Sequence, residues 1–282
     1  MTSMINLSNK YNRIFSFGCS YTRYYYPTWA NIVSSQFSQS YFINFGVSGS
    51  GNSLLLTRLA QVHSKFNLEK NDLVLIMYPS YTREDRFLSE GIWYTPGNIF
   101  SNPDIDSNAL NFYKSYGCYL HYMIRDMSYI FMVEKFLENL GCDKFTLLSA
   151  NLIDVENSVI NNSASILIEE KNKHNYEKLL ETYNSLLTKF PISYHEFLYK
   201  NYVSQDRITG VKLENGHDIH PTPLQGVEYL QHIGLELNQS ALDYAAIHNK
   251  IIFSCNSLEQ VKTVYRDMQE KHDYCIMSNG IL

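Results

Sequence analysis

Shortly after its start the chain reads Arg13-Ile-Phe-Ser-Phe-Gly-Cys-Ser20. Residues 13–17 form an apolar run that predicts a buried strand, and Gly18 ends it. A strand that turns sharply into a helix places the next residue at the carboxyl edge of the sheet, where open α/β folds bind their ligands. The N–H groups and positive dipole end of such a helix suit the stabilisation of an oxyanion. Ser20 is therefore a candidate functional residue, although a lone serine in this place is most often a helix cap.

Strands and helices alternate through the first half of the chain. Asp72 to Tyr78 (DLVLIMY) is a continuous apolar run, which is typical of a central parallel strand buried on both faces. This alternation predicts right-handed strand–helix–strand units and a parallel sheet. The expected strands cover 13–17, 41–45, 72–78 and 144–149, and the expected helices cover 29–37, 53–66 and 119–140.

Two regions interrupt the alternation. Residues 83–116 are rich in Pro, Gly, Asn and Asp and hold Trp93, which predicts a long excursion over the top of the sheet. Residues 151–175 are polar. The segments expected after them are a helix over 176–189, a helix from Gly226 to about 237, a further segment to 249, a short strand over 251–254 and a helix over 257–271.

Bulk composition excludes several classes of function. The 282 residues are 45% hydrophobic, which is enough for one large domain or for one domain with an appendage. A formal net charge of -5 provides no basic surface for nucleic acid and no polybasic patch for a membrane. Residues 1–10 lack a secretory signal, and no stretch approaches the ~18 apolar residues of a transmembrane helix. We therefore expect a cytoplasmic protein with neither nucleic acid nor a membrane as partner.

The five cysteines are widely scattered and form no CxxC pair. This pattern favours reduced thiols over a disulfide framework or a zinc site, and we expect no metal and no cofactor. The cysteines are Cys19, Cys118, Cys142, Cys255 and Cys275.

A second glycine-rich turn follows the strand expected at 41–45. It reads Asn44-Phe-Gly-Val-Ser-Gly-Ser-Gly-Asn52 and opens the next helix. Glycines let a backbone approach a ligand closely, although an isolated cluster is most simply a tight turn. Gly46, Gly49 and Gly51 lack the spacing of a dinucleotide-binding motif, and no acidic residue ends the following strand.

An acid–base pair lies towards the end of the chain, in His217-Asp-Ile-His-Pro-Thr-Pro223. A hydroxyl nucleophile needs a base to take its proton, and that base needs a carboxylate to orient it. Asp218 and His220 supply both groups two residues apart on one loop. Taken alone, such a pair beside prolines is usually only a polar turn.

Together the three segments resemble the SGNH/GDSL hydrolases, whose chain order is a nucleophilic Ser, an oxyanion-hole Gly, and then Asp and His near the C-terminus. The resemblance implies a flavodoxin-like three-layer α/β/α fold with a parallel central sheet. It also implies catalytic roles for Ser20, His220 and Asp218. The backbone N–H groups of Ser20 and Gly49 would then form the oxyanion hole.

The motifs depart from the usual family pattern in three places. Cys19 stands where Asp commonly precedes the nucleophile, and Asp-x-His replaces Asp-x-x-His, a spacing similar to that of phage and bacterial members. The Asn that the family has after the central strand is missing, because this segment reads Pro79-Ser-Tyr-Thr-Arg-Glu84. The resemblance covers about 13–86 and again 215–233, and the rest of the chain carries no motif.

The lost Asn draws attention to the residues around it. Arg83 either holds an anionic or sugar part of the substrate or pairs with a neighbouring carboxylate, Glu84 or Asp85. Asn52 either supplies the missing oxyanion donor or sits structurally in the following helix. The substrate-binding candidates are Arg83, Tyr21 and Ser80.

These observations favour a serine esterase that removes an O-acyl group, and in particular an O-acetyl group, from a polar carbohydrate substrate. The polar character of 83–116 suits a glycan ester better than a long acyl chain. The 23 tyrosines suit a sugar-binding cleft, but overall composition explains them equally well. Two alternatives stay open: a glycan-binding or accessory module with weak catalysis, and an acyltransferase.

The expected domain division is an SGNH-like domain over 1–240, with an insertion at about 83–116, and a C-terminal α/β extension over 241–282 that packs on it. The amphipathic helix expected at 257–271 either packs on its own domain or makes a dimer contact, so oligomerisation is left open.

Overall fold

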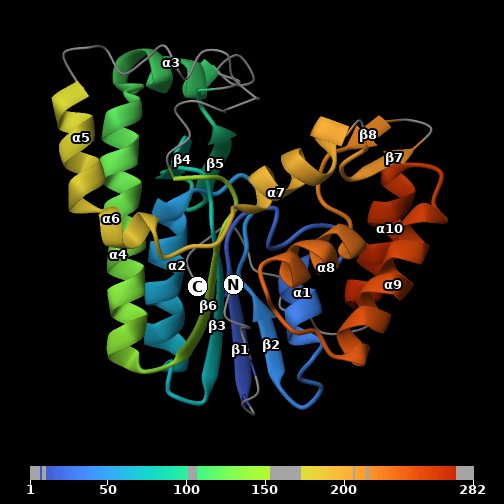
Figure 1. Ribbon diagram of the computed structural model, residues 1–282. Coiled ribbons are helices and arrows are strands. Elements are labelled where there is room, and N and C mark those ends of the chain that lie inside the picture. Colours follow the sequence, from blue (N-terminus) through green and yellow to red (C-terminus); the bar gives the residue numbers. More distant parts are fainter. Residues whose placement is uncertain are drawn as a thin grey trace.

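The centre of the computed structural model is a four-stranded parallel sheet in the order β2-β1-β3-β6 (Figure 1). The structure describes residues 7, 11–100, 107–152, 173–205, 207–213 and 216–270. Counted along the chain, this strand order is 2-1-3-4, the arrangement of a flavodoxin-like sheet. The predicted parallel sheet is confirmed. The strands are β1 (Arg13–Phe17), β2 (Tyr41–Asn44), β3 (Asp72–Tyr78) and β6 (Asp143–Leu148).

Strand β3 explains why the sheet is covered on both faces. All seven of its residues are buried, and successive side chains of a strand point to opposite faces. Val74, Ile76 and Tyr78 belong to one core cluster, whereas Leu73 and Leu75 belong to the other. A sheet that is apolar on both faces needs a layer of helices on each side, and this requirement produces three layers.

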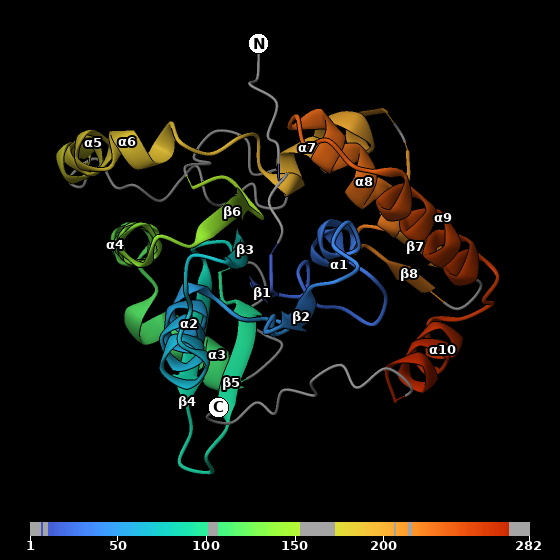
Figure 2. The ribbon, with the colours of Figure 1, turned by 90° about the horizontal axis from the view of Figure 1, so that it is seen from below.

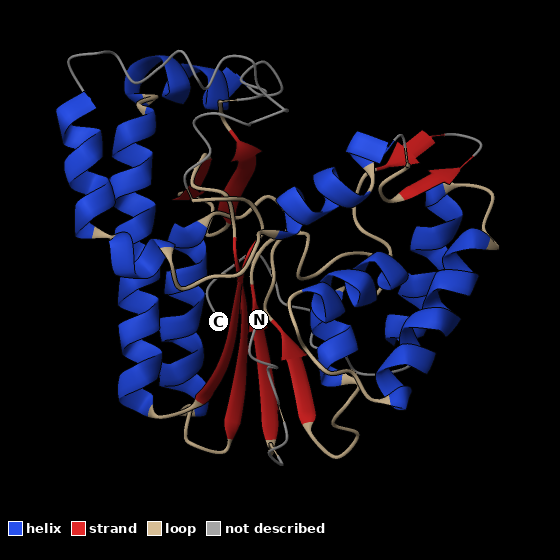
Figure 3. Ribbon diagram, viewed as in Figure 1, coloured by secondary structure: helices blue, strands red, loops and turns tan. Residues whose placement is uncertain are grey.

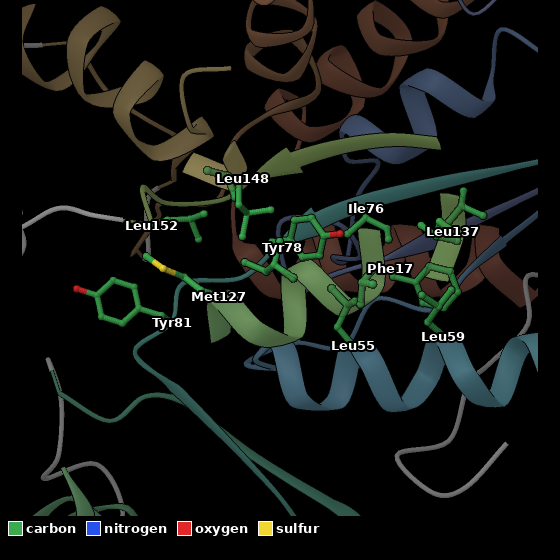
Figure 4. Close-up of a cluster of buried hydrophobic side chains, with 14 of the residues drawn as sticks. Phe17, Leu55, Leu59, Ile76, Tyr78, Tyr81, Met127, Leu137, Leu148 and Leu152 are labelled. Carbon is green, nitrogen blue, oxygen red and sulfur yellow. The ribbon is translucent and has the colours of Figure 1, made fainter. Parts of the chain in front are cut away.

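One helical layer is formed chiefly by α2 (Asn52–Phe66) and α4 (Tyr119–Leu140), and the opposite layer by α1 (Trp29–Ser34), α8 (Pro223–His232) and α9 (Gln239–Phe253). Figure 2 shows the sheet between these two sets of helices. In the first layer Leu55 and Leu59 of α2 and Met127 of α4 belong to the same buried cluster as Phe17 and Ile76 of the sheet, and Figure 4 shows these side chains. Helices α5 (Lys173–Thr182) and α6 (Asn184–Leu187) extend this layer.

The segment 83–116 differs from the predicted loop excursion, because it holds regular structure. Strands β4 (Arg83–Phe87) and β5 (Trp93–Asn98) form an antiparallel hairpin, and α3 (Ser107–Tyr116) follows. Strand β4 could not be predicted from the sequence, because Arg-Glu-Asp-Arg shows no apolar alternation. Strand β5 could not be predicted either, because it contains Pro96 and Gly97, which are unfavourable in strands. The hairpin lies beyond the carboxyl ends of the central strands (Figure 3).

The C-terminal part differs from the prediction in one element. Residues 251–253 belong to helix α9, so the short strand expected at 251–254 is wrong. A short apolar run fits a strand and a buried helix segment equally well, and here the helical context decides. Helix α10 (Leu258–Glu270) confirms the last predicted helix. The described part of 241–282 is therefore helical, and the domain boundary near 240 stays a prediction.

A further helix and a further pair of strands were not predicted. Helix α7 (Tyr194–Asn201) packs with α8 in the second layer, and a short antiparallel pair of strands precedes the His220 loop. This pair is formed by β7 (Val211–Leu213) and β8 (Gly216–Asp218), and Figure 3 shows it at the same end of the molecule as the β4–β5 hairpin.

The β4–β5 hairpin caps helix α2. The N-cap of α2 is Gly51, which has no side chain to bond the first N–H groups of the helix. Asp85 of β4 replaces such a cap: its two carboxylate oxygens accept hydrogen bonds from the N–H groups of Gly51 (2.8 Å) and Leu54 (2.9 Å). Asp85 is only 4% exposed, so removing it would leave two buried donors unsatisfied.

We predict that Asp85→Ala lowers the free energy of unfolding by about 1–3 kcal/mol, the usual range for unsatisfied buried donors, as measured by urea denaturation. Asp243→Ala removes an exposed carboxylate on α9 that accepts a bond from Gln239, and it should change stability by no more than about 0.5 kcal/mol. Equal stability of the two variants would show that the hairpin does not cap α2.

Candidate active site

Ser20 lies in a tight turn directly after β1. The N–H groups of Thr22 and Arg23 both donate to the Cys19 carbonyl, at 2.9 and 3.1 Å. Gly18 makes this turn possible: its φ is +151°, and a Cβ atom there would lie 2.2 Å from the Thr22 hydroxyl oxygen and 2.7 Å from the Met77 carbonyl oxygen. Ser20 is 7% exposed. The adjoining helix that the sequence predicted begins only at residue 29, so the turn itself, and not a helix N-terminus, presents Ser20.

The Gly49 turn lies beside the Ser20 turn. The Gly18 carbonyl accepts hydrogen bonds from the Val47 N–H (2.9 Å) and from the Ser50 hydroxyl (3.1 Å), and these bonds join the two turns. Gly49 has a φ of +76°, and a Cβ atom there would lie 2.3 Å from the Thr95 carbonyl oxygen of β5. Only glycine fits this position, because both the backbone angle and the close approach of β5 exclude a side chain.

The acid–base pair spans the end of β8, where Asp218 lies, and the short loop that follows it, which carries His220. The Nδ1 atom of His220 lies 2.7 Å from Asp218 Oδ1, which also accepts the His220 backbone N–H at 3.0 Å. An imidazole that donates from Nδ1 keeps Nε2 as a proton acceptor. The neighbouring His217 directs Nε2 to the Thr209 carbonyl instead, at 2.7 Å. The Asp-x-His spacing thus suffices to orient one imidazole.

The loop after Ser20 contacts the acid–base pair directly. The Tyr24 ring stacks on the His220 ring with centroids 3.8 Å apart, and its hydroxyl donates to Asp218 Oδ2 at 2.8 Å. The Tyr26 hydroxyl donates to the His220 carbonyl at 2.8 Å, and the Tyr21 ring meets the His220 ring edge-on at 5.7 Å. Segments almost two hundred residues apart are therefore joined beside the nucleophile candidate. The sequence signal for these contacts is the run of three consecutive tyrosines at 24–26.

These contacts also set the charge of the carboxylate. Burial by itself would raise the pKa of Asp218, but hydrogen bonds from the His220 ring, the His220 backbone and the Tyr24 hydroxyl hold it below its ordinary value. Burial and the same carboxylate raise the pKa of Tyr24 well above its ordinary value. Tyr24 therefore stays a protonated donor and Asp218 stays an anion, which is the state that stabilises an imidazolium.

Ser20 and His220, both described, are not joined by a direct hydrogen bond, so the structure brings their loops together but does not close the Ser–His contact. In enzymes without bound substrate such contacts are often long and tighten only in the complex. The roles of Ser20, His220, Asp218 and Gly49 remain predictions that this arrangement permits.

Asn52 does not have the geometry of an oxyanion donor. It is 1% exposed, and its amide donates to the Pro79 carbonyl at 2.9 Å and to Asp126 Oδ2 at 2.8 Å. Both amide hydrogens are therefore used, and the interpretation of Asn52 as the missing donor is wrong. Burial raises the pKa of Asp126 to about 7, against the opposing effects of Arg125 and Asn52.

Arg83 pairs with neither of the adjacent carboxylates. Glu84 bonds Arg86 and Arg125, each at 2.9 Å, and Asp85 is occupied with the N–H groups of α2. Arg83 instead donates from Nη1 to the Ser50 carbonyl, at 3.1 Å. Ser80, another predicted substrate contact, shares a hydrogen bond of 2.8 Å with the Thr82 hydroxyl.

The described residues contain no group of three or more His, Cys, Asp and Glu side chains that could hold a metal ion. None of the described helices combines the length and the apolar character that crossing a membrane requires. The four described cysteines, Cys19, Cys118, Cys142 and Cys255, are free, and Cys275 lies outside the described residues.

Comparison with known proteins gives matches among solved structures alone. No protein-family model and no curated protein matches the chain. The similar solved structures include GDSL proteins and an acetylxylan esterase. A member of the lipolytic G-D-S-L family from Veillonella parvula is 13% identical, with 82% of this chain and 96% of that chain covered and a TM-score of 0.40. A GDSL-like lipase from Bacteroides thetaiotaomicron is 14% identical, with 79% and 85% covered and a TM-score of 0.38.

The acetylxylan esterase is from Geobacillus stearothermophilus; it is 14% identical, with 80% of this chain and 95% of that chain covered and a TM-score of 0.41. The G-D-S-L name is that of the group which the sequence motifs resemble. At these identities and scores, the chemistry of the site has to be inferred from its own residues.

We predict that Tyr24→Phe, which keeps the ring but removes the hydroxyl, lowers the free energy of unfolding by about 1 kcal/mol near neutral pH, through loss of a bond to a charged group. Because the folded-state pKa of Asp218 is depressed, this contribution exists above the unfolded pKa and is lost as pH falls through the folded pKa. The stability difference should therefore vanish in acid. Tyr25→Phe, at an exposed neighbour, is the control. A pH-independent difference would contradict the link to Asp218.

Proposed function

We propose that this chain is an SGNH-type serine esterase with Ser20 as nucleophile, His220 as general base and Asp218 as the carboxylate that orients the base. The observation that carries the proposal is the contact of the loop after Ser20 with the acid–base pair, in which Tyr24 bonds Asp218 and stacks on His220. A loop used merely as a surface connection has no need to hold a buried carboxylate and an imidazole in this way.

In the proposed reaction the Ser20 Oγ attacks the ester carbonyl and His220 Nε2 accepts its proton. Asp218 stabilises the imidazolium and keeps the proton on Nδ1. The backbone N–H groups of Ser20 and Gly49 receive the oxyanion. His220 then gives the proton to the departing alcohol, which leaves an acyl group on Ser20, and a water activated by the same imidazole releases that group as the acid.

The substrate we propose is a polar O-acyl compound, with an O-acetylated carbohydrate as the specific case. The chain beside the two turns is polar, because β4 brings Arg83 and Asp85 against Gly51, at the end of the Gly49 turn. The aromatic rings of Tyr21 and Tyr24 at His220 suit the apolar face of a sugar or a small acyl group. A long acyl chain would need a larger apolar surface than these residues offer.

A glycan-binding module of weak catalytic power is the second candidate. It is favoured by the absence of a Ser20–His220 hydrogen bond and by the loss of Asn52 as an oxyanion donor. An acyltransferase would use the same groups and differ only in excluding water from the acyl-enzyme. Two measurements separate these three functions. An esterase turns over a simple ester, an acyltransferase forms an acyl-enzyme that is stable in water, and a binding module does neither.

We predict that Ser20→Ala reduces hydrolysis of p-nitrophenyl acetate to the uncatalysed rate and abolishes covalent labelling by a fluorophosphonate probe, since no other group takes over the nucleophile's role. Ser48→Ala is the matched control, because Ser48 is an exposed serine of the neighbouring turn. Its activity and its labelling should equal those of the wild type.

Thermal unfolding of both variants should stay within a few degrees of the wild type, since no side-chain hydrogen bond joins Ser20 to another described residue. Full activity of Ser20→Ala would exclude this serine as nucleophile. A wild-type protein that is neither labelled nor active on any small acetyl ester would leave the binding module as the function.

A further inference from the structure

The proposed oxyanion hole has two backbone donors and no side-chain donor. The side-chain amide of Asn52 donates both of its hydrogens, to the Pro79 carbonyl and to Asp126. Each donor in an oxyanion hole usually contributes about 100-fold or more to the rate. A third donor would have to come from an element next to both turns. Strand β3 pairs with β1, and the chain that leaves β3 leads within five residues to Arg83 at the start of β4.

Arg83 is packed against the Gly49 turn. A Cβ atom on Gly51 would lie 3.1 Å from the Arg83 Cβ, so the two backbones are in close contact. The side chain then reaches along the turn, and Nη1 donates to the carbonyl of Ser50, the residue after Gly49, at 3.1 Å. This bond fixes the guanidinium at the Ser50–Gly51 peptide, two peptide units along the turn from the proposed Gly49 N–H donor.

The rest of the guanidinium has no acceptor among the described residues. Its Nε–H is buried without a hydrogen-bond partner, and no hydrogen bond of Nη2 is found within the same part of the chain. Nε and Nη2 form one edge of the guanidinium, the edge that binds an oxyanion through two parallel hydrogen bonds. A buried donor without a partner is costly, and functional sites are where such groups are found.

The positive charge of Arg83 acts on the site. Burial raises the pKa of Tyr21 to about 12; Asp218 acts in the same direction, and Arg83 opposes it. The hydroxyl of Tyr21, the residue after Ser20, therefore experiences both the guanidinium and the catalytic carboxylate. A cation in this position would stabilise negative charge that develops on a substrate bound to Ser20.

The hairpin that carries Arg83 is held from several sides. Arg125 Nη2 donates to the Arg83 carbonyl at 2.7 Å, and Arg125 is itself bonded to Glu84 and Asp126. On the other strand, the Thr95 hydroxyl donates to the Ser48 carbonyl at 3.0 Å. Electrostatic catalysis requires donors that are fixed before the reaction, and these bonds provide such fixation.

We propose that Arg83 is the third oxyanion donor of the site. The Nε–Nη2 edge of its guanidinium would take the place of the neutral side-chain amide that is missing here. This inference rests on the proposed esterase function. Arg83 would act on every ester, whatever the rest of the substrate contains. A residue that merely binds an anionic or sugar part would act only on substrates that carry one.

The test uses p-nitrophenyl acetate, which has neither an anionic group nor a sugar. We expect Arg83→Ala to lower kcat by about 100-fold or more with KM within about twofold, because the interaction is made in the transition state. Arg83→Lys keeps the charge but not the two-pronged edge and should recover part of the loss. Added guanidinium chloride at millimolar concentration should partly rescue the Ala variant.

Arg86→Ala is the matched control, because Arg86 is the other arginine of β4, its side chain is 55% exposed, and it pairs with Glu84. Its kcat should equal that of the wild type. A rise in KM alone for Arg83→Ala, or a kcat equal to that of Arg86→Ala, would overturn the inference. Circular dichroism of each variant detects misfolding. If Arg83→Ala misfolds, the test is made with Arg83→Lys, whose kcat should fall while its KM stays near that of the wild type.

The same measurements separate this inference from the function on which it rests. Activity that survives in Ser20→Ala would end the esterase proposal itself. An inactive Ser20→Ala together with a fully active Arg83→Ala would leave the esterase in place and remove Arg83 from its oxyanion hole.

Discussion

The candidate site depends on the contact between two loops that lie almost two hundred residues apart in the sequence. Asp218 is bonded from both sides, by His220 through Oδ1 and by Tyr24 through Oδ2. Each of these bonds contributes on the order of 1–3 kcal/mol to the stability of the fold, and this helps to offset the entropy of closing so long a loop. Because Tyr24 is four residues from Ser20, the bond that fixes the carboxylate also fixes the nucleophile's turn.

The parallel sheet makes this contact possible. Strand β1 lies between β2 and β3, so the turn after it is flanked by the chain leaving both neighbours, the Gly49 turn and the segment leading to β4. The carbonyl of Gly18 joins the first two of these turns, and Asp85 and Arg83 tie the third to them. The polar network at this edge thus rests on strands whose apolar faces are buried by helices on both sides.

The sequence was most informative where burial is complete. The apolar run of β3 could be predicted because all seven of its residues are buried in the same apolar environment. Strand β4 could not, because its Arg-Glu-Asp-Arg sequence is chosen for bonds to α2 and α4 and not for apolar alternation. The same reason applies to residues 251–253, where a short apolar run was assigned to a strand but belongs to α9.

The candidate site could be located in part from the sequence, and the roles of its residues stay predictions. Motif order and spacing pointed to Ser20, Gly49, Asp218 and His220, and the structure places their loops together without closing the Ser20–His220 contact. Spacing could not reveal Tyr24, since its role depends on a partner 194 residues away. Nor could it show that Asn52 bonds Asp126 of α4, a contact that only packing of α2 against α4 creates.

The most direct measurement is a crystal structure of the protein after reaction with diethyl p-nitrophenyl phosphate, an analogue of the tetrahedral intermediate. We predict phosphorus bonded to Ser20 Oγ, with its oxygen within about 3 Å of the Gly49 N–H and the Arg83 guanidinium, and a second oxygen near His220 Nε2. An adduct on another residue, or an unmodified Ser20 with His220 turned away from it, would contradict the account.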